Sequence, residues 1–119
     1  MTVLEPSIAV MDAVASSPSR PATSMLLDTD DARIVVFRIA AGQAVPPHRS
    51  DATVLLYVLG GSGFISGGDG ERACAPGDLV AFEPGELHGM RAVDETFKLL
   101  ATITPRPGTR NAVAPSETR

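Results

Sequence analysis

The chain has 119 residues, of which 44% are hydrophobic and 20% charged, and its formal net charge is −4. This length suits one domain with one core, and no apolar run approaches the roughly 20 residues that a membrane-spanning helix needs. The scattered basic residues and the lack of Trp argue against nucleic-acid binding, because phosphates attract a concentrated basic face and bases stack on aromatic rings. We therefore expect no nucleic-acid partner and no membrane partner.

Residues 1–24 are expected to form an N-terminal arm outside the main domain. Residues 7–15, SIAVMDAVA, fit either a short helix capped by Ser7 or an extended segment, and the Ser- and Pro-rich stretch 16–21 is typical of a linker. The arm has no basic region followed by an apolar core, and the single cysteine, Cys74, cannot form an internal disulfide. Both observations favour the cytoplasm.

Residues 25–104 are expected to form strands separated by turns. The predicted strands, rich in β-branched and aromatic residues, are 33–39, 54–59, 61–66, 71–75, 79–82, 88–93 and 96–104, with a hairpin turn at 67–70. Gly and Pro recur between them at intervals of about 8–12 residues, the spacing typical of β-sandwiches and barrels. No helical periodicity interrupts the series, so interleaved helices are not expected. The tail, residues 105–119, contains three prolines and is expected to be flexible.

Two stretches of the chain share one arrangement of residue types. Residues 42–61 and residues 77–88 each begin with a glycine turn and contain a proline, a histidine and a short apolar strand. These histidines, His48 and His88, are the only two in the chain. We ask whether they meet inside one domain.

The two stretches resemble the paired motifs of the cupin superfamily, which consists of small RmlC-like jelly-roll β-barrels. In the first motif, Gly42 is followed after five residues by His48, and Gly61 stands at the closing glycine. The position of the second motif histidine holds Ser50, and the position of the motif glutamate holds Val54.

The second motif is also present, with one change. Gly77, Gly85 and His88 match in spacing, while Glu83 stands at the proline position and the proline itself follows it. The resemblance covers residues 25–104. It implies an all-β fold, a cupin-type jelly-roll β-barrel that forms a single domain.

The resemblance also implies a depleted metal site. In metal-bearing cupins three histidines and one glutamate hold a divalent ion, such as Zn, Fe, Mn or Ni. Here only His48 and His88 remain as metal ligands, because Val54 has no donor atom and the neutral hydroxyl of Ser50 is a poor ligand. Candidates for a third ligand are Glu83, Glu86, Asp51 and Cys74, although a buried, unreactive thiol is the simpler reading of Cys74.

We expect His48 and His88 to line one pocket, as catalytic acid and base or as metal ligands, although they could be ordinary, partly buried histidines. The candidate ligand-binding residues around them are Arg49, Ser50, Phe82, Glu83 and Met90. Arg49 is expected either to form an exposed ion pair with Asp51 or to hold an anionic ligand. Glu83 and Glu86 are expected to be solvated turn carboxylates, or carboxylates that orient His88.

Three functions fit these features. The first is a small-molecule-binding protein without turnover, favoured by the loss of two metal-ligand positions. The second is a small cupin enzyme of the isomerase, dehydratase, cyclase or dioxygenase type, favoured by the two surviving imidazoles. The third is a structural or oligomerisation domain, which requires an interior filled by side chains.

Two apolar stretches predict a homodimer. Residues 34–37 and 97–100 are almost uninterruptedly apolar, so both faces of these strands are expected to be covered. A second copy of the chain would provide this cover, as small cupins commonly do. The alternative is cover by the N-terminal arm of the same chain.

Overall fold

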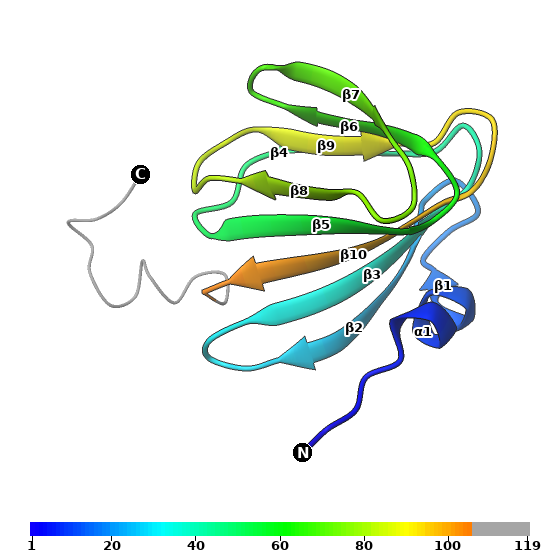
Figure 1. Ribbon diagram of the computed structural model, residues 1–119. Helices are drawn as coiled ribbons and strands as arrows, with labels where there is room; N and C mark the ends of the chain where they lie inside the picture. Colours follow the sequence, from blue (N-terminus) through cyan, green and yellow to red (C-terminus); the bar gives the residue numbers. More distant parts are fainter. Residues whose placement is uncertain (106–119) are drawn as a thin grey trace.

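The computed structural model describes residues 1–105, which form two antiparallel β-sheets and a short helix, α1 (Pro6–Asp12) (Figure 1). The strands are β1 (Val14–Ala15), β2 (Ala22–Asp28), β3 (Arg33–Ile39), β4 (Ala44–His48), β5 (Thr53–Gly60), β6 (Gly63–Gly67), β7 (Gly70–Cys74), β8 (Leu79–Phe82), β9 (His88–Arg91) and β10 (Phe97–Thr104). One sheet has the order β1-β2-β3-β10-β5-β8 and the other β4-β9-β6-β7. The all-β jelly-roll prediction is confirmed, with two facing sheets rather than one closed ring of strands.

The core lies between the two sheets because alternate residues of each strand point inward. In β10, the central strand of the larger sheet, Phe97 and Leu99 are fully buried and Ala101 nearly so. β10 pairs with β3 on one side and β5 on the other, and places Leu99 opposite both Phe37 and Val58. These inward rows form one wall of the interior.

The closing glycine of the first motif has a steric reason. Gly61 follows β5 with φ of +68°, a conformation that L side chains rarely adopt. A Cβ atom at this position would also collide with the carbonyl oxygen of Thr96. The turn from β5 into β6 therefore requires glycine, and β6 continues through the predicted hairpin into β7, where Gly67 pairs with Gly70.

The sequence predicted β3 and β8 with their observed bounds but did not predict β1, β2 or β4. The β4 segment, AVPPH, contains two prolines and lies at a sheet edge, where a missing N–H group is tolerated. The helix begins at Pro6, earlier than the predicted Ser7 cap, and ends at Asp12, in keeping with the preference for proline in a first helical turn. Of the predicted tail, residues 106–119 lie outside the described part of the chain.

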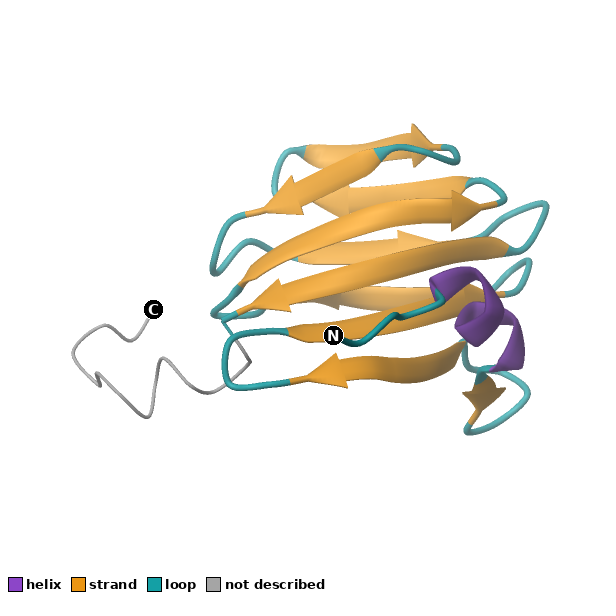
Figure 2. Cartoon of the chain, turned by 60° about the horizontal axis from the view of Figure 1, so that its bottom comes forward, coloured by secondary structure: helices purple, strands orange, loops and turns teal. Residues whose placement is uncertain are grey.

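Helix α1 covers part of the outer face of the larger sheet. The Nη1 atom of Arg38 in β3 donates to the carbonyl oxygens of Val10 and Met11, at 2.7 and 3.0 Å. Val10 and Val36 are both buried, and Figure 2 shows the helix lying across one end of this face. The cover by the N-terminal arm, one of the two alternatives, is therefore present over β2, β3 and β10. Within residues 1–105, no helix has the length and hydropathy required to cross a membrane.

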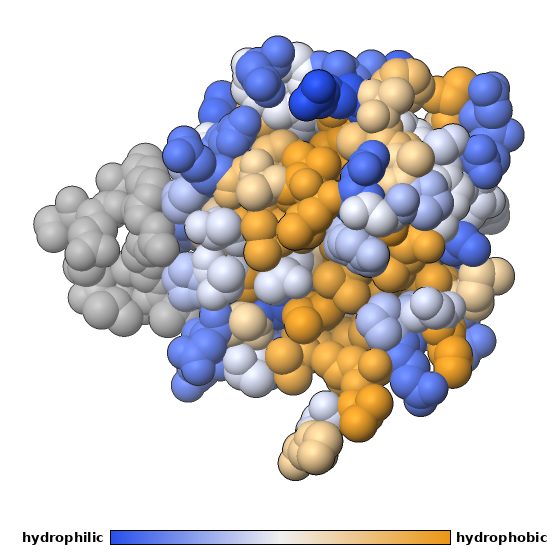
Figure 3. Space-filling model, in the orientation of Figure 1, coloured by the Kyte–Doolittle hydropathy of each residue, from blue (hydrophilic) through white to orange (hydrophobic). Residues whose placement is uncertain are grey.

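The rest of this outer face carries apolar side chains. The strand register places Leu27, Ile34, Leu55, Tyr57, Leu79 and Leu100 on it. We call these six residues the outer apolar face. Leu79 is 63% exposed and Tyr57 is 41% exposed, and in Figure 3 apolar surface extends across the middle of the molecule towards the N-terminal segment.

Candidate functional site

The two histidines are cross-strand neighbours. His48 ends β4 and His88 begins β9, and the antiparallel pairing of these strands sets the two residues opposite each other. Their ring centroids lie 4.3 Å apart, with the ring planes at 60°. β9 approaches β4 closely at Gly89, where a Cβ atom would lie 3.0 Å from the backbone of Val45 and Pro47. The pairing of β4 with β9 thus brings the two histidines together, with His88 buried and His48 exposed.

His88 lies in an apolar environment that disfavours its charged form. The residue is 4% exposed, and its ring stacks on Phe82 with centroids 4.9 Å apart. Burial lowers the pKa of His88 below its usual value, and the nearby His48 lowers it further, while the carbonyl of Glu86 opposes the shift. His88 is therefore a neutral imidazole at neutral pH.

A hydrogen bond at Nδ1 sets the tautomer of each ring. The Nδ1 atom of His48 lies 3.1 Å from the carbonyl oxygen of Pro46, and that of His88 lies 3.1 Å from the carbonyl oxygen of Glu86. A carbonyl oxygen only accepts, so in the neutral form of either ring we assign the proton to Nδ1. Nε2 then keeps its lone pair, and each ring offers an acceptor or a metal-ligating nitrogen.

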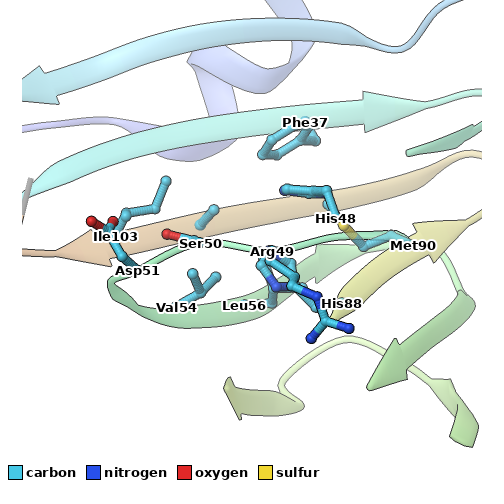
Figure 4. A pocket seen from close by; sticks show the side chains of 11 residues that line it. Phe37, His48, Arg49, Ser50, Asp51, Val54, Leu56, His88, Met90 and Ile103 are labelled. Carbon is cyan, nitrogen blue, oxygen red and sulfur yellow. The ribbon is translucent and has the colours of Figure 1, made fainter. Parts of the chain in front are cut away.

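Both rings line a cavity of about 480 Å³, which we call the first cavity (Figure 4). Its lining residues are Phe37, His48, Arg49, Ser50, Asp51, Val54, Leu56, His88, Met90, Ala101 and Ile103. All four motif positions, residues 48, 50, 54 and 88, are among them. The walls are mostly apolar, with the imidazoles among a few polar groups, which is the usual composition of a small-molecule pocket.

The structure brings together three of the five candidate ligand-binding residues. Arg49, Ser50 and Met90 line the first cavity, whereas Phe82 supports the ring of His88 and lines another cavity. Glu83 is exposed and is not among the lining residues. The sequence analysis missed Phe37, Ala101 and Ile103, which the register of β3 and β10 brings to the cavity.

Two charged residues near the histidines contact the backbone. Arg49 donates from Nη1 to the carbonyl oxygen of Gly85 at 2.8 Å, a contact that the sequence did not predict. The carboxylate of Glu86 accepts from the N–H groups of Glu83 and Gly68, at 3.1 and 3.2 Å. It therefore holds two turns, while the backbone carbonyl of Glu86, and not a side chain, orients His88.

The donor groups do not fit a metal ion held by three protein ligands. Within residues 1–105, no group of three His, Cys, Asp or Glu side chains is placed to hold one. The Oγ atom of Ser50 accepts from the N–H group of Ala52 at 3.1 Å, and Val54 is buried without a donor atom. Cys74, one of the candidate third ligands, is a buried thiol whose pKa is raised by burial, as the simpler reading predicted.

Comparison with known proteins places these features in a family. The family described as "AraC-like ligand binding domain" matches residues 33–109, more than half of the chain. An RmlC-like cupin protein from Desulfovibrio desulfuricans is 30% identical over 80% of this chain and 92% of its own, with a TM-score of 0.69. The protein is a cupin of the AraC-like ligand-binding family. No curated protein sequence matches the chain.

Two other solved structures share the cupin's fold. The DMSP lyase DddQ from Ruegeria pomeroyi is 26% identical over 71% of this cupin, with a TM-score of 0.67. The cupin spans 47% of the lyase, about half its length. KdgF from Halomonas sp. has a TM-score of 0.77 over 92% of this cupin and 98% of its own chain, at 18% identity, which is a likeness of fold alone.

The buried His88 predicts a pH-dependent stability. Its pKa in the folded cupin lies below the unfolded value of about 6.5, so the unfolded chain binds more protons as the pH falls through 6.5. Stability is therefore lost below this pH, until the pH also falls below the folded pKa. We expect His88→Gln to lose less stability than the wild type between pH 7.5 and 5.5 in urea unfolding. Equal losses in the two proteins would contradict this expectation.

Proposed function

We propose that this cupin binds a small molecule in the first cavity, without turnover. The observation that carries the proposal is that all four motif positions line one cavity. Two of these positions, Ser50 and Val54, hold residues that are poor metal ligands or none. A cavity of about 480 Å³ lies in the size range of small-molecule sites. Its volume also argues against a purely structural domain, which would have a filled interior.

The chemistry of the cavity defines the ligand class. The Nε2 atoms of His48 and His88 accept hydrogen bonds, because each Nδ1 atom is used by a backbone carbonyl. Val54, Leu56 and Met90 offer apolar contact nearby. We therefore infer a ligand with an apolar body and a hydroxyl or amino group that donates towards the imidazoles.

Matched pairs of small probes test this inference. Phenols and cyclic alcohols, each compared with its methyl ether, would be screened by ligand-observed NMR. We expect the hydroxyl compounds to bind better, and His48→Gln and His88→Gln to weaken their binding about tenfold, the effect of losing about 1.4 kcal/mol.

The control variant is Arg72→Gln, an exposed position on β7 outside the first cavity. It should leave binding unchanged. Equal binding of alcohols and ethers, or unchanged binding in both histidine variants, would refute the proposed ligand contacts.

Catalysis is the second candidate function. The neutral His88 lies beside His48, and such a pair supports proton abstraction by one ring and proton return by the other. Isomerisation, dehydration or cyclisation of a small metabolite is the class of reaction that this pair would serve. Turnover that is lost in both His48→Gln and His88→Gln would favour the enzyme over the binding protein.

A divalent ion such as Zn, Fe, Mn or Ni is a cofactor proposal linked to this alternative. His48 and His88 would be its protein ligands, and the ion would supply a Lewis acid. Elemental analysis of protein purified without chelators or nickel tests it directly. A stoichiometric metal that disappears in the double histidine variant would favour a metal-dependent function, including oxygenation.

We also propose that the cupin is a homodimer formed through the outer apolar face. Helix α1 covers one end of this sheet, and exposed side chains such as Leu79 and Tyr57 lie on the remainder. Exposed apolar patches of this kind mark protein–protein interfaces.

Because Cys74 is a single, buried thiol, we infer a cytoplasmic location, where no disulfide is needed.

A further inference from the structure

A second cavity, of about 460 Å³, lies beside the first. It is lined by Ser16, Ser19, Arg20, Pro21, Thr23, Phe37, Ala44, Val45 and Pro46. These residues come from the segment before β2, the inner side of β2 and β3, and the edge strand β4. Phe37 lines both cavities, and Figure 4 shows its side chain extending from β3 on the side of the first cavity.

The lining of the second cavity favours an anion. Arg20 supplies a positive charge, Ser16, Ser19 and Thr23 supply hydroxyl groups, and the lining contains no Asp or Glu. Three other cavities within residues 1–105 each include at least one acidic residue. The chain has a net charge of −4, so its overall electric field repels anions. A cavity that contains a cation and no carboxylate differs from this overall charge and favours an anion locally.

The segment that carries Arg20 is fixed by hydrogen bonds. The Nε2 atom of Gln43 donates to the carbonyl oxygen of Pro18 at 3.0 Å, while its Oε1 atom accepts from the N–H group of Ala40 at 3.0 Å. The N–H group of Arg20 itself donates to the carbonyl oxygen of Ser17 at 3.2 Å. The backbone at Arg20 is therefore tied to the β3–β4 turn before any ligand binds, which lowers the entropic cost of binding.

The guanidinium of Arg20 remains available. Among the hydrogen bonds and ion pairs within residues 1–105, none uses this side chain, whereas Arg33 and Arg91 pair with carboxylates and Arg38 and Arg49 bind carbonyl oxygens. A free guanidinium presents a fork of donors that matches a carboxylate. Phe37 and Val45 offer an apolar surface in the same cavity.

We propose that the second cavity is a binding site for a small organic acid, separate from the ligand of the first cavity. Its carboxylate binds Arg20 and the neighbouring hydroxyl groups, and its apolar body packs on Phe37 and Val45. The single cation suits a monoanion better than a phosphate ester, whose charge near −2 calls for more positive groups. This assignment does not depend on what the histidines bind.

Phenylacetate is the test probe, and 2-phenylethanol is its neutral counterpart of similar size. Binding would be measured by protein-observed NMR titration in low-salt buffer. We expect saturable shifts at the amides of Thr23 and Phe37 with phenylacetate, and binding at least about tenfold weaker with 2-phenylethanol. Arg20→Gln is expected to weaken phenylacetate about tenfold to a hundredfold. Added salt should also weaken it, since the contact is electrostatic.

Two matched variants serve as controls for Arg20→Gln. Arg72→Gln removes another exposed charge, and Arg49→Gln removes the guanidinium of the first cavity; both should leave the affinity for phenylacetate within about twofold. The proposal is overturned by an absence of saturable binding, by equal binding of 2-phenylethanol, or by an unchanged affinity in Arg20→Gln. It is also overturned if Arg49→Gln has the larger effect, or if phenyl phosphate binds more than about tenfold tighter than phenylacetate.

Discussion

The double substitution Ser50→His and Val54→Glu is expected to raise the affinity of the first cavity for Zn²⁺ by at least about 100-fold. Residues 50 and 54 line the cavity together with His48 and His88. The two new side chains would complete a set of three imidazoles and one carboxylate. Each added ligand replaces a water molecule on the ion, and affinity rises steeply with the number of protein ligands.

The thermal stability of the double variant should also depend on Zn²⁺. Without metal, the variant carries a carboxylate at position 54, where the valine is 3% exposed, so it should unfold at a lower temperature than the wild type. Zn²⁺ at 1,000 times its Kd would restore about 4 kcal/mol through binding to the folded state. Calorimetric titration and thermal unfolding with and without Zn²⁺ measure the two effects.

The matched control is Ser50→His with Val54→Gln, which has nearly the same shape but lacks the anionic ligand. It should gain less affinity than the glutamate variant and show a smaller thermal shift. Equal Zn²⁺ affinity in the wild type and both variants would mean that these positions do not converge as the structure places them.

The double substitution Tyr57→Arg and Leu79→Arg is expected to convert the proposed dimer into a monomer, with a dimerisation Kd raised at least about 100-fold. The two residues are register partners on adjacent strands of the outer apolar face. In a dimer with a two-fold axis, both copies present the same patch to each other. The new guanidiniums would be buried without partners and would repel their counterparts.

Sedimentation velocity across a concentration series measures this effect. Val93→Arg is the matched control, because Val93 is 42% exposed, close to the value for Tyr57, and lies in the loop between β9 and β10. It should leave the association unchanged. A wild type that is monomeric at every concentration, or a double variant that stays dimeric, would refute the proposed interface.

The elements that the sequence predicted well are those whose local composition and tertiary environment agree. Five of the seven residues of β3 are β-branched or aromatic, and the strand lies within the larger sheet between β2 and β10. β2 was missed because much of it is polar or exposed, and a register shift between Met25 and Leu27 breaks its alternation. β4 was missed because Pro46 and Pro47 favour a turn locally, whereas an edge position accommodates them.

The site shows a similar division. The resemblance to the paired cupin motifs predicted that His48 and His88 would lie together, and the pairing of β4 with β9 brings them together. The spacing did not predict that Phe37 and Ile103 line the cavity, because their positions depend on the register of β3, β10 and β5. Nor did it predict that backbone carbonyls would orient both rings. Every residue has a backbone carbonyl, so the sequence does not show which carbonyl accepts a hydrogen bond.

Phe37 lines both cavities, so the two proposed sites share one side chain. An occupant that shifts the rotamer of this ring on one side changes the space available on the other. Linkage makes the effect mutual: the factor by which the first occupant alters the affinity for the second equals the factor in the opposite direction. If both proposed ligands bind, a single aromatic side chain would let each of them change the affinity for the other.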